Sequence, residues 1–215
     1  MKFNKDTLLL YAVTDRDSLD RQTFYKQIKA ALVGGVTIVQ LREKNLPYEE
    51  LVKEALEIKE LCHSFNVPLI INDNVDAAIQ CGADGVHVGA DDMPVEEIRK
   101  KTPPNFIIGA TAKTAEQAQA AEKAGADYLG VGAVFPSPTK TNAVRITYDQ
   151  LKEISAAVNI PTVAIGGISL ENVTRLKDSG VNGIAVVSAI FSAEDIKTQT
   201  EKLKEKAKYI IEVAK

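Results

Sequence analysis

The amino-acid sequence predicts a single domain over residues 1–215, folded as a closed (β/α)8 TIM barrel. Eight short apolar, β-branched runs alternate with longer amphipathic segments along the chain. Runs that are apolar at nearly every position indicate parallel strands covered by helices, and the alternation indicates βα units. Eight such units in this length favour a closed barrel over an open, doubly wound sheet, and no G-x-G-x-x-G pattern follows the first run.

A recurring phrase supports the repeat. Residues 77–89, 120–132 and 175–187 each place a glycine after a helix-like stretch and enter an apolar run a few residues later. Glycine favours the left-handed conformation that ends many helices. The predicted strands are residues 8–15, 36–43, 68–73, 85–89, 106–111, 128–135, 161–167 and 183–190. The predicted helices between them include residues 48–65, 115–124, 148–158, 169–179 and 193–213, with a short segment at 95–101.

Composition excludes several classes of protein. Hydrophobic residues are 45%, charged residues are 26% and the formal net charge is −3, which argues against disorder and against a broad nucleic-acid surface. Cys62 and Cys81 are too few for a disulfide framework and lack metal-site spacing, so we expect reduced packing residues. The start lacks the features of a signal peptide, and no segment has the ~18 apolar residues that span a bilayer. We expect a soluble, cytoplasmic protein, and a homo-oligomer is compatible with these totals.

The second predicted strand ends in charge. Side chains two apart in a strand share a face, so Gln40, Arg42 and Lys44 point one way and Glu43 points the other. Active sites of (β/α)8 barrels lie where the strands end, so these three donors predict a site for an oxygen-rich anion. A solvated strand end with an Arg-Glu pair is the alternative.

The third and fourth strands end in oxygen ligands. Asn72 can donate to an oxyanion and Asp73 can bind a divalent cation, while Asp91 and Asp92 lie on the next loop. Two carboxylates beside a cluster of anion donors predict Mg²⁺ shared with a phosphate ligand. An Asp pair in a loop is also common as a helix cap or turn.

The later strands add a second set of anion-binding groups. The loop after strand six, FPSPTKTNA, carries Ser137, Thr139 and Lys140, and it predicts an anion clamp unless it is a plain proline-rich turn. Phosphate sites in such barrels commonly form after strands seven and eight, where Gly166, Gly167 and Ser188 lie. Strand five ends in GATAKT and offers Thr111. We predict that His87 is a satisfied core histidine and that His63 is on the surface.

These residues resemble the thiamine phosphate synthase family. Its motifs appear here as QLREK (40–44), INDNVDAAIQCGADGVHVGADDMP (71–94), AEKAGADYLGVGAVFPSPTK (121–140) and AIGGI (164–168). The likeness runs from YAVTD near the start to VVSAI near the end. The order and completeness of the motifs make the resemblance specific. It implies a transferase that uses Mg²⁺ to join a pyrimidine pyrophosphate, HMP-PP, to a thiazole phosphate, giving thiamine phosphate and pyrophosphate.

The resemblance also implies a role for each residue that matches a family motif. Arg42, Lys44, Lys140 and Thr111 would be catalytic, with Thr111 near the pyrimidine where the family typically has serine. Asp73 and Asp92 would hold Mg²⁺. The pyrophosphate would be held by Gln40, Arg42, Lys44, Asn72 and Lys140, and the thiazole phosphate by Ser137, Thr139, Gly167 and Ser188 with Ala189 adjacent.

Two rival functions share the fold. A thiazole tautomerase relative would keep the thiazole phosphate pocket without the pyrophosphate and metal residues, and a non-catalytic thiazole phosphate sensor could lose the metal carboxylates. Retention of Lys44, Asp73, Asp92 and Lys140 favours the synthase. The family is described as reacting through a dissociative, carbocation-like step. Ala90, where the family often has glutamine, and Ser137, where threonine is common, depart from the family pattern.

Overall fold

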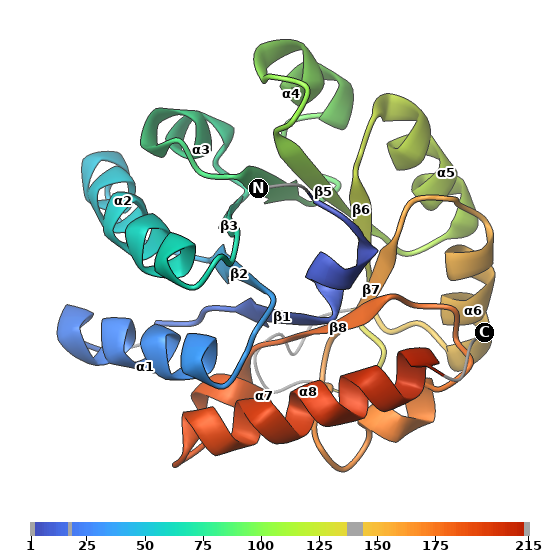
Figure 1. The fold of residues 1–215 in the computed structure, drawn as a ribbon. Coiled ribbons are helices and arrows are strands. Elements are labelled where there is room, and N and C mark those ends of the chain that lie inside the picture. Colours follow the sequence, from blue (N-terminus) through green and yellow to red (C-terminus); the bar gives the residue numbers. More distant parts are fainter. Residues whose placement is uncertain (1–2, 17–18, 137–143, 213–215) are drawn as a thin grey trace.

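The computed structural model describes residues 3–16, 19–136 and 144–212, and these contain a closed barrel of eight parallel strands. The strands follow one another in sequence order around the barrel, with β1 and β8 closing it, and the helices lie outside (Figure 1). The predicted fold is therefore confirmed. The strands are β1 (Leu10–Val13), β2 (Ile38–Leu41), β3 (Leu69–Asn72), β4 (Gly85–Val88), β5 (Ile107–Ala112), β6 (Tyr128–Gly132), β7 (Thr162–Ile165) and β8 (Gly183–Val186).

The helices follow the predicted pattern over most of the chain. They are η1 (Lys5–Leu8), α1 (Arg21–Val33), α2 (Tyr48–Ser64), α3 (Val75–Cys81), α4 (Val95–Lys101), α5 (Ala115–Ala124), α6 (Tyr148–Ala156), η2 (Val173–Leu176), α7 (Ser188–Phe191) and α8 (Ile196–Glu212). Gly82 and Gly125 end α3 and α5 in the left-handed conformation, with φ of 62° and 99°, as the recurring phrase predicts.

Several predicted boundaries are off by a few residues, and in three places the element itself differs from the predicted one. The expected helix over 169–179 is a turn followed by the short η2, because Ser169 and Asn172 bond to nearby backbone groups and compete with helix formation. Residues 188–190 belong to α7 rather than to the last strand, and Leu8 belongs to η1 rather than to the first. Apolar runs alone do not separate these states.

The interior of the barrel and the shell around it form two separate apolar clusters. The inner cluster joins Leu8, Tyr11, Val13, Ile38, Ile70, Ile107, Tyr128, Val163 and Ala185. The outer cluster lies between strands and helices and contains both cysteines, which are buried thiols as predicted. η1 lies against the barrel at the start of β8, and Phe3 stacks against Tyr128 with ring centroids 5.8 Å apart. The inner cluster thus fills the interior of the barrel.

The amino-terminal end of the barrel is held by one contact that occurs four times. Before β2, β4, β6 and β8, a polar side chain accepts a hydrogen bond from the backbone N–H of a residue in the preceding strand. The four acceptor and donor pairs are Thr37 and Leu10 (2.9 Å), Asp84 and Leu69 (2.8 Å), Asp127 and Ile108 (2.7 Å), and Asn182 and Thr162 (3.0 Å). The contact fixes each odd-numbered strand to the turn before the next strand.

No helix in the described residues has the length and apolar character to cross a membrane.

Candidate active site

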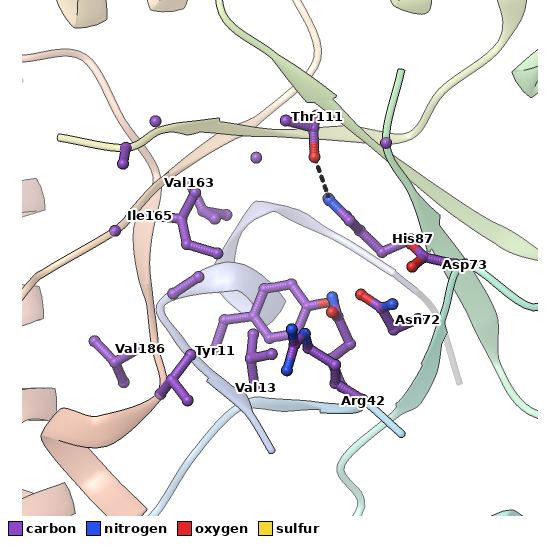
Figure 2. Close-up of a pocket in the computed structure, with 18 of the residues that line it drawn as sticks. Tyr11, Val13, Arg42, Asn72, Asp73, His87, Thr111, Val163, Ile165 and Val186 are labelled. Carbon is purple, nitrogen blue, oxygen red and sulfur yellow. Dashed lines mark hydrogen bonds between the residues drawn. The ribbon is translucent and has the colours of Figure 1, made fainter. Parts of the chain in front are cut away.

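A cavity of about 490 Å³ opens at the carboxyl ends of the strands, and all eight strands contribute to its lining. This volume suits one small organic ligand. Figure 2 shows Arg42 and Asn72 approaching the cavity from neighbouring strands, with Asp73 and His87 beside them. Nine of the predicted site residues line it: Gln40, Arg42, Lys44, Asn72, Asp73, Asp92, Thr111, Gly167 and Ser188.

The end of β2 presents its donors as the two-residue period predicts. Gln40, Arg42 and Lys44 all line the cavity. The backbone N–H of Arg42 donates to the Thr14 hydroxyl at 2.9 Å, which ties the ends of β1 and β2 together. The Arg42 guanidinium lies 3.7 Å from the Asp15 carboxylate, and both side chains are partly exposed. An anionic ligand would therefore compete with Asp15 for a cation that is already held near the cavity.

Glu43 points away from the cavity and anchors the strand end. Its carboxylate accepts a hydrogen bond from Arg16 Nε at 3.0 Å, and Arg16 also pairs with Glu54 of α2. The guanidinium of Arg16 lies over the Phe24 ring, 4.7 Å from its centroid. Burial raises the pKa of Glu43, Arg16 opposes that shift, and the nearby Glu54 adds to it. Arg16 therefore joins β2 to α1 and α2 directly behind Arg42 and Lys44.

Asp73 and Asp92 form a pair of carboxylates beside the donors. Asp73 has a φ of 60°, a left-handed conformation that is uncommon for residues other than glycine, asparagine and aspartate. Burial raises the pKa of Asp73, the adjacent Asp92 carboxylate raises it further, and Asn72 and Lys44 lower it. The Oδ2 atom of Asp92 accepts a hydrogen bond from the Gly89 N–H at 2.7 Å. Asp73, whose pKa is raised by burial and by a neighbouring carboxylate, forms with that neighbour a fitting donor set for a divalent cation.

The far side of the cavity is built on close backbone packing. Gly166 and Gly167 have φ of 103° and 64°, and a side chain on Gly167 would overlap the backbone oxygens of Phe135 and Pro136. The glycines are therefore needed for the fold as well as for access to the cavity. Ser188 begins α7, where helix geometry leaves the first N–H groups without intrahelical acceptors. Ala189 packs against the outer cluster. Ser137, Thr139 and Lys140 lie outside the described residues.

His87 is bonded at both ring nitrogens, as predicted for a core histidine. Its Nδ1 lies 3.0 Å from the Tyr128 hydroxyl and its Nε2 lies 3.1 Å from the Thr111 hydroxyl (Figure 2 draws the second contact). Burial lowers the pKa of His87 to about 4. The imidazole is consequently neutral at pH 7. His63 is exposed and lies 2.8 Å from the Asp84 carboxylate at the opposite end of the barrel.

Several residues of the cavity have no counterpart in the sequence-based prediction. Tyr11 lines the cavity, its hydroxyl lies 2.8 Å from that of Tyr128, and it accepts a hydrogen bond from Gln40 Nε2 at 2.8 Å. Gln117 also lines the cavity, and the apolar wall comes from Val13, Val163, Ile165 and Val186. The two-residue period of a strand could have predicted Tyr11 and Val13, because these side chains share the inward face of β1.

The chain matches proteins of one family. A family described as thiamine monophosphate synthase matches residues 10–190. Thiamine-phosphate synthase from Clostridium tetani is 47% identical over 194 residues, which cover 90% of this chain and 93% of that protein. The corresponding protein of Ruminiclostridium cellulolyticum is 46% identical and covers 91% of this chain and 93% of its own length.

A solved structure agrees with these relatives. Thiamine phosphate pyrophosphorylase from Pyrococcus furiosus superposes with a TM-score of 0.88 at 39% identity, covering 96% of this chain and 98% of that chain. 3-Hexulose-6-phosphate synthase superposes with a TM-score of 0.71 at 16% identity and shares the fold alone. The extent of the first match, together with the sequence relatives, establishes that this chain belongs to the thiamine monophosphate synthase family and is an enzyme, a transferase.

Proposed function

We propose that this enzyme is a thiamine-phosphate synthase that couples HMP-PP to a thiazole phosphate and releases pyrophosphate. The names of its relatives support the synthase over a tautomerase. The observation that carries the proposal is the convergence of Arg42, Lys44, Asn72, Asp73 and Asp92 on a single cavity. These residues come from three segments of the chain, at the ends of β2 and β3 and after β4, and a tautomerase would have no pyrophosphate for them to bind.

The two cations and the amide act on the leaving group. Pyrophosphate leaves carbon readily only when its growing negative charge is neutralised, and Arg42 and Lys44 can supply that neutralisation from one face of β2. Asn72 adds a neutral donor from β3. The partial burial of these groups strengthens their attraction to an anion relative to water. Cleavage of the C–O bond would leave a carbocation stabilised by the pyrimidine, which the thiazole nitrogen then captures.

Asp73 and Asp92 would hold Mg²⁺. These carboxylates would hold the ion beside the leaving group, where it would supply positive charge against the growing negative charge of pyrophosphate. The raised pKa of Asp73, caused by burial and then by the neighbouring Asp92 carboxylate, supports the assignment, because a bound cation would offset both causes. The protein would therefore favour metal binding by holding these two carboxylates close to each other.

Gly167 and Ser188 would bind the phosphate of the thiazole substrate. Gly167 allows close backbone approach and Ser188 offers a hydroxyl at the start of α7, on the β7 and β8 side of the cavity. Gln40, Arg42 and Lys44 lie on the β2 side. Two anion sites supplied by different strands would place the thiazole ring and the pyrimidine between them.

A direct assay tests the proposal. Purified protein is incubated with HMP-PP, thiazole phosphate and Mg²⁺, and thiamine phosphate and pyrophosphate are measured together. We expect equal amounts of both products and none of the coupled product when either substrate is omitted. Isomerisation of thiazole without pyrophosphate release would indicate the tautomerase instead, and the absence of any coupled product would refute the proposal.

A further inference from the structure

At the inner surface of the cavity, five side chains from five strands form a continuous chain of hydrogen bonds, and four of them, all but Tyr128, line the cavity. The chain runs from Gln40 on β2 through Tyr11 on β1, Tyr128 on β6 and His87 on β4 to Thr111 on β5. Its four contacts measure 2.8, 2.8, 3.0 and 3.1 Å. Tyr11, Tyr128 and Gln40 are buried, with exposed fractions of 1%, 0% and 4%. Both ends of the chain, Gln40 and Thr111, line the cavity.

The direction of these hydrogen bonds follows from a count of protons. Each buried phenol carries one proton, and a neutral imidazole that meets a hydroxyl at both ring nitrogens carries one as well. Three bonds join Tyr11, Tyr128, His87 and Thr111, and these four groups carry four protons. One proton is therefore left over. If Tyr128 accepted both of its bonds, its own proton would be buried and unpaired, so the spare proton points out of the chain at one end, either from Tyr11 toward Gln40 or from Thr111 into the cavity.

Gln40 decides between the two ends. Its amide Nε2 donates to the Tyr11 hydroxyl, so Tyr11 accepts there and must direct its own proton to Tyr128. Tyr128 then donates to His87 Nδ1, and His87 donates from Nε2 to the Thr111 oxygen. The remaining proton, on the Thr111 hydroxyl, faces the cavity. An amide nitrogen carries two protons, so Gln40 can hold Tyr11 and also donate to an anion.

We propose that Tyr11, Tyr128 and His87 are positioning residues that fix the Thr111 hydroxyl as a hydrogen-bond donor toward an acceptor atom of the ligand, such as a nitrogen of a heteroaromatic ring. The inference rests on the proposed function for the identity of that ligand, but the direction of the bonds does not. An anion at Gln40 and an acceptor at Thr111 require the same direction. One direction of hydrogen bonding therefore suits a ligand that places an anionic group at Gln40 and an acceptor atom at Thr111.

The packing of the barrel interior holds the Tyr128 and His87 rings in place. A side chain on Gly109 would overlap the Tyr128 phenol, and one on Gly130 would lie 3.1 Å from His87 Cε1. Glycines on β5 and β6 thus leave the room that the rings occupy. Tyr128 also contacts Tyr11 and Phe3 edgewise or tilted, with ring centroids 5.9 and 5.8 Å apart. Removal of a hydroxyl from Tyr128 should leave this ring packing in place.

Nitrogen NMR tests the direction without any substrate. His63 and His87 are the two histidines of the chain, so a His63→Gln variant assigns the signals of ¹⁵N-labelled protein. We expect the His87 proton on Nε2 at neutral pH. A proton on Nδ1 would overturn the proposal, because Thr111 would then donate to His87 and offer the cavity only an acceptor. This outcome is independent of whether the protein makes thiamine phosphate.

A double-mutant cycle tests the function of the chain. Tyr128→Phe should lower kcat/KM for HMP-PP about 2- to 10-fold, the net value of one hydrogen bond, and Thr111→Val should lower it at least as much. Because Tyr128 acts through Thr111, adding Tyr128→Phe to Thr111→Val should change kcat/KM by less than about 2-fold. Thr111→Ser keeps the hydroxyl and should preserve the effect of Tyr128→Phe.

Two controls separate this role from a general loss of structure. Thr200→Val removes another buried hydroxyl, one that donates to Ile196 O at 2.7 Å on α8, and it should lower stability without affecting kcat/KM per folded molecule. Equal, multiplicative losses from Tyr128→Phe in the wild-type and Thr111→Val backgrounds would overturn the positioning role. Absence of synthesis with an Nε2 proton on His87 would contradict the proposed function alone.

Discussion

At the amino-terminal end of the barrel the same bond holds four pairs of strands, whereas at the carboxyl end the strands finish in different residues. Thr37, Asp84, Asp127 and Asn182 each accept a hydrogen bond from the preceding strand. At the other end, β2 leads to Arg42, β3 leads to Asp73, and β5 presents Thr111. The first arrangement satisfies local backbone groups, and the second gathers charge into a cavity.

This difference divides stability from function along the barrel axis. A buried N–H paired with a nearby side chain lowers the energy of the folded chain whether or not ligand is present. The carboxyl end instead contains groups that are costly when the cavity is unoccupied by ligand, as the raised pKa of Asp73 shows. Substitutions at the two ends should consequently separate melting temperature from activity.

The largest effect should come from Asp73→Asn. Asparagine tolerates the left-handed φ of this position, so the backbone should be kept, while one metal-binding carboxylate is lost. We expect kcat/KM to fall by about 10²-fold or more. Because the substitution removes repulsion with Asp92, the melting temperature in chelator should stay equal or rise. Full synthesis by this variant in excess chelator would remove Asp73 from the metal site.

The converse substitution is Asp127→Ala at the amino-terminal end. It removes the acceptor for the Ile108 N–H and the partner of Arg99, which lies 2.7 Å away. The expected loss is about 2 kcal/mol of unfolding free energy in urea, because a buried donor is left unpaired. Activity per folded molecule should be unchanged, and Asp127→Asn, which keeps an acceptor, should recover much of the loss. A large drop in kcat would break the division between the two ends.

His87 should make stability depend on pH. Its pKa is about 4 in the folded protein and ordinarily 6.5, so between these values the unfolded chain binds a proton that the folded one does not. The contribution is therefore complete above pH 6.5 and is lost as pH falls toward 4. At pH 5 the free energy of unfolding should be roughly 2 kcal/mol lower than at pH 7.5. The free energy of unfolding in urea, measured between pH 4 and 7.5, should fall more steeply with decreasing pH for wild type than for His87→Gln. Parallel pH dependences of the two proteins would contradict this prediction.

Glu43→Ala should have the smallest effect of the four. It removes the partner of Arg16 behind Arg42 and Lys44, and we expect KM for HMP-PP to rise about 5-fold, equivalent to about 1 kcal/mol, with little change in kcat. Arg21→Ala breaks the exposed pair with Glu57 on the neighbouring helix and should leave KM unchanged. Equal effects of the two variants would show that Glu43 has no special part in presenting the cations.

Sequence patterns sufficed where neighbours along the chain determine the structure. Alternation within β2 placed Gln40, Arg42 and Lys44 on one side of the strand, and the glycine phrases placed the ends of α3 and α5. They failed for residues 169–179, where side-chain bonds to the backbone replaced the expected helix. They also missed the contact of Tyr11 with Tyr128, residues 117 positions apart, because it depends on which strands face each other across the closed barrel.

The glycines on β5 and β6 restrict how this protein can change. Tyr128 occupies the volume that a side chain at position 109 would need, and His87 would be crowded by one at position 130, so each ring limits which residue the nearby position accepts. Gly109→Ala alone should be poorly tolerated, whereas the same change paired with a smaller residue at position 128 should be accepted more readily. Building this hydrogen-bonded chain into another barrel would therefore require glycine at the two positions equivalent to 109 and 130, as well as the five polar residues.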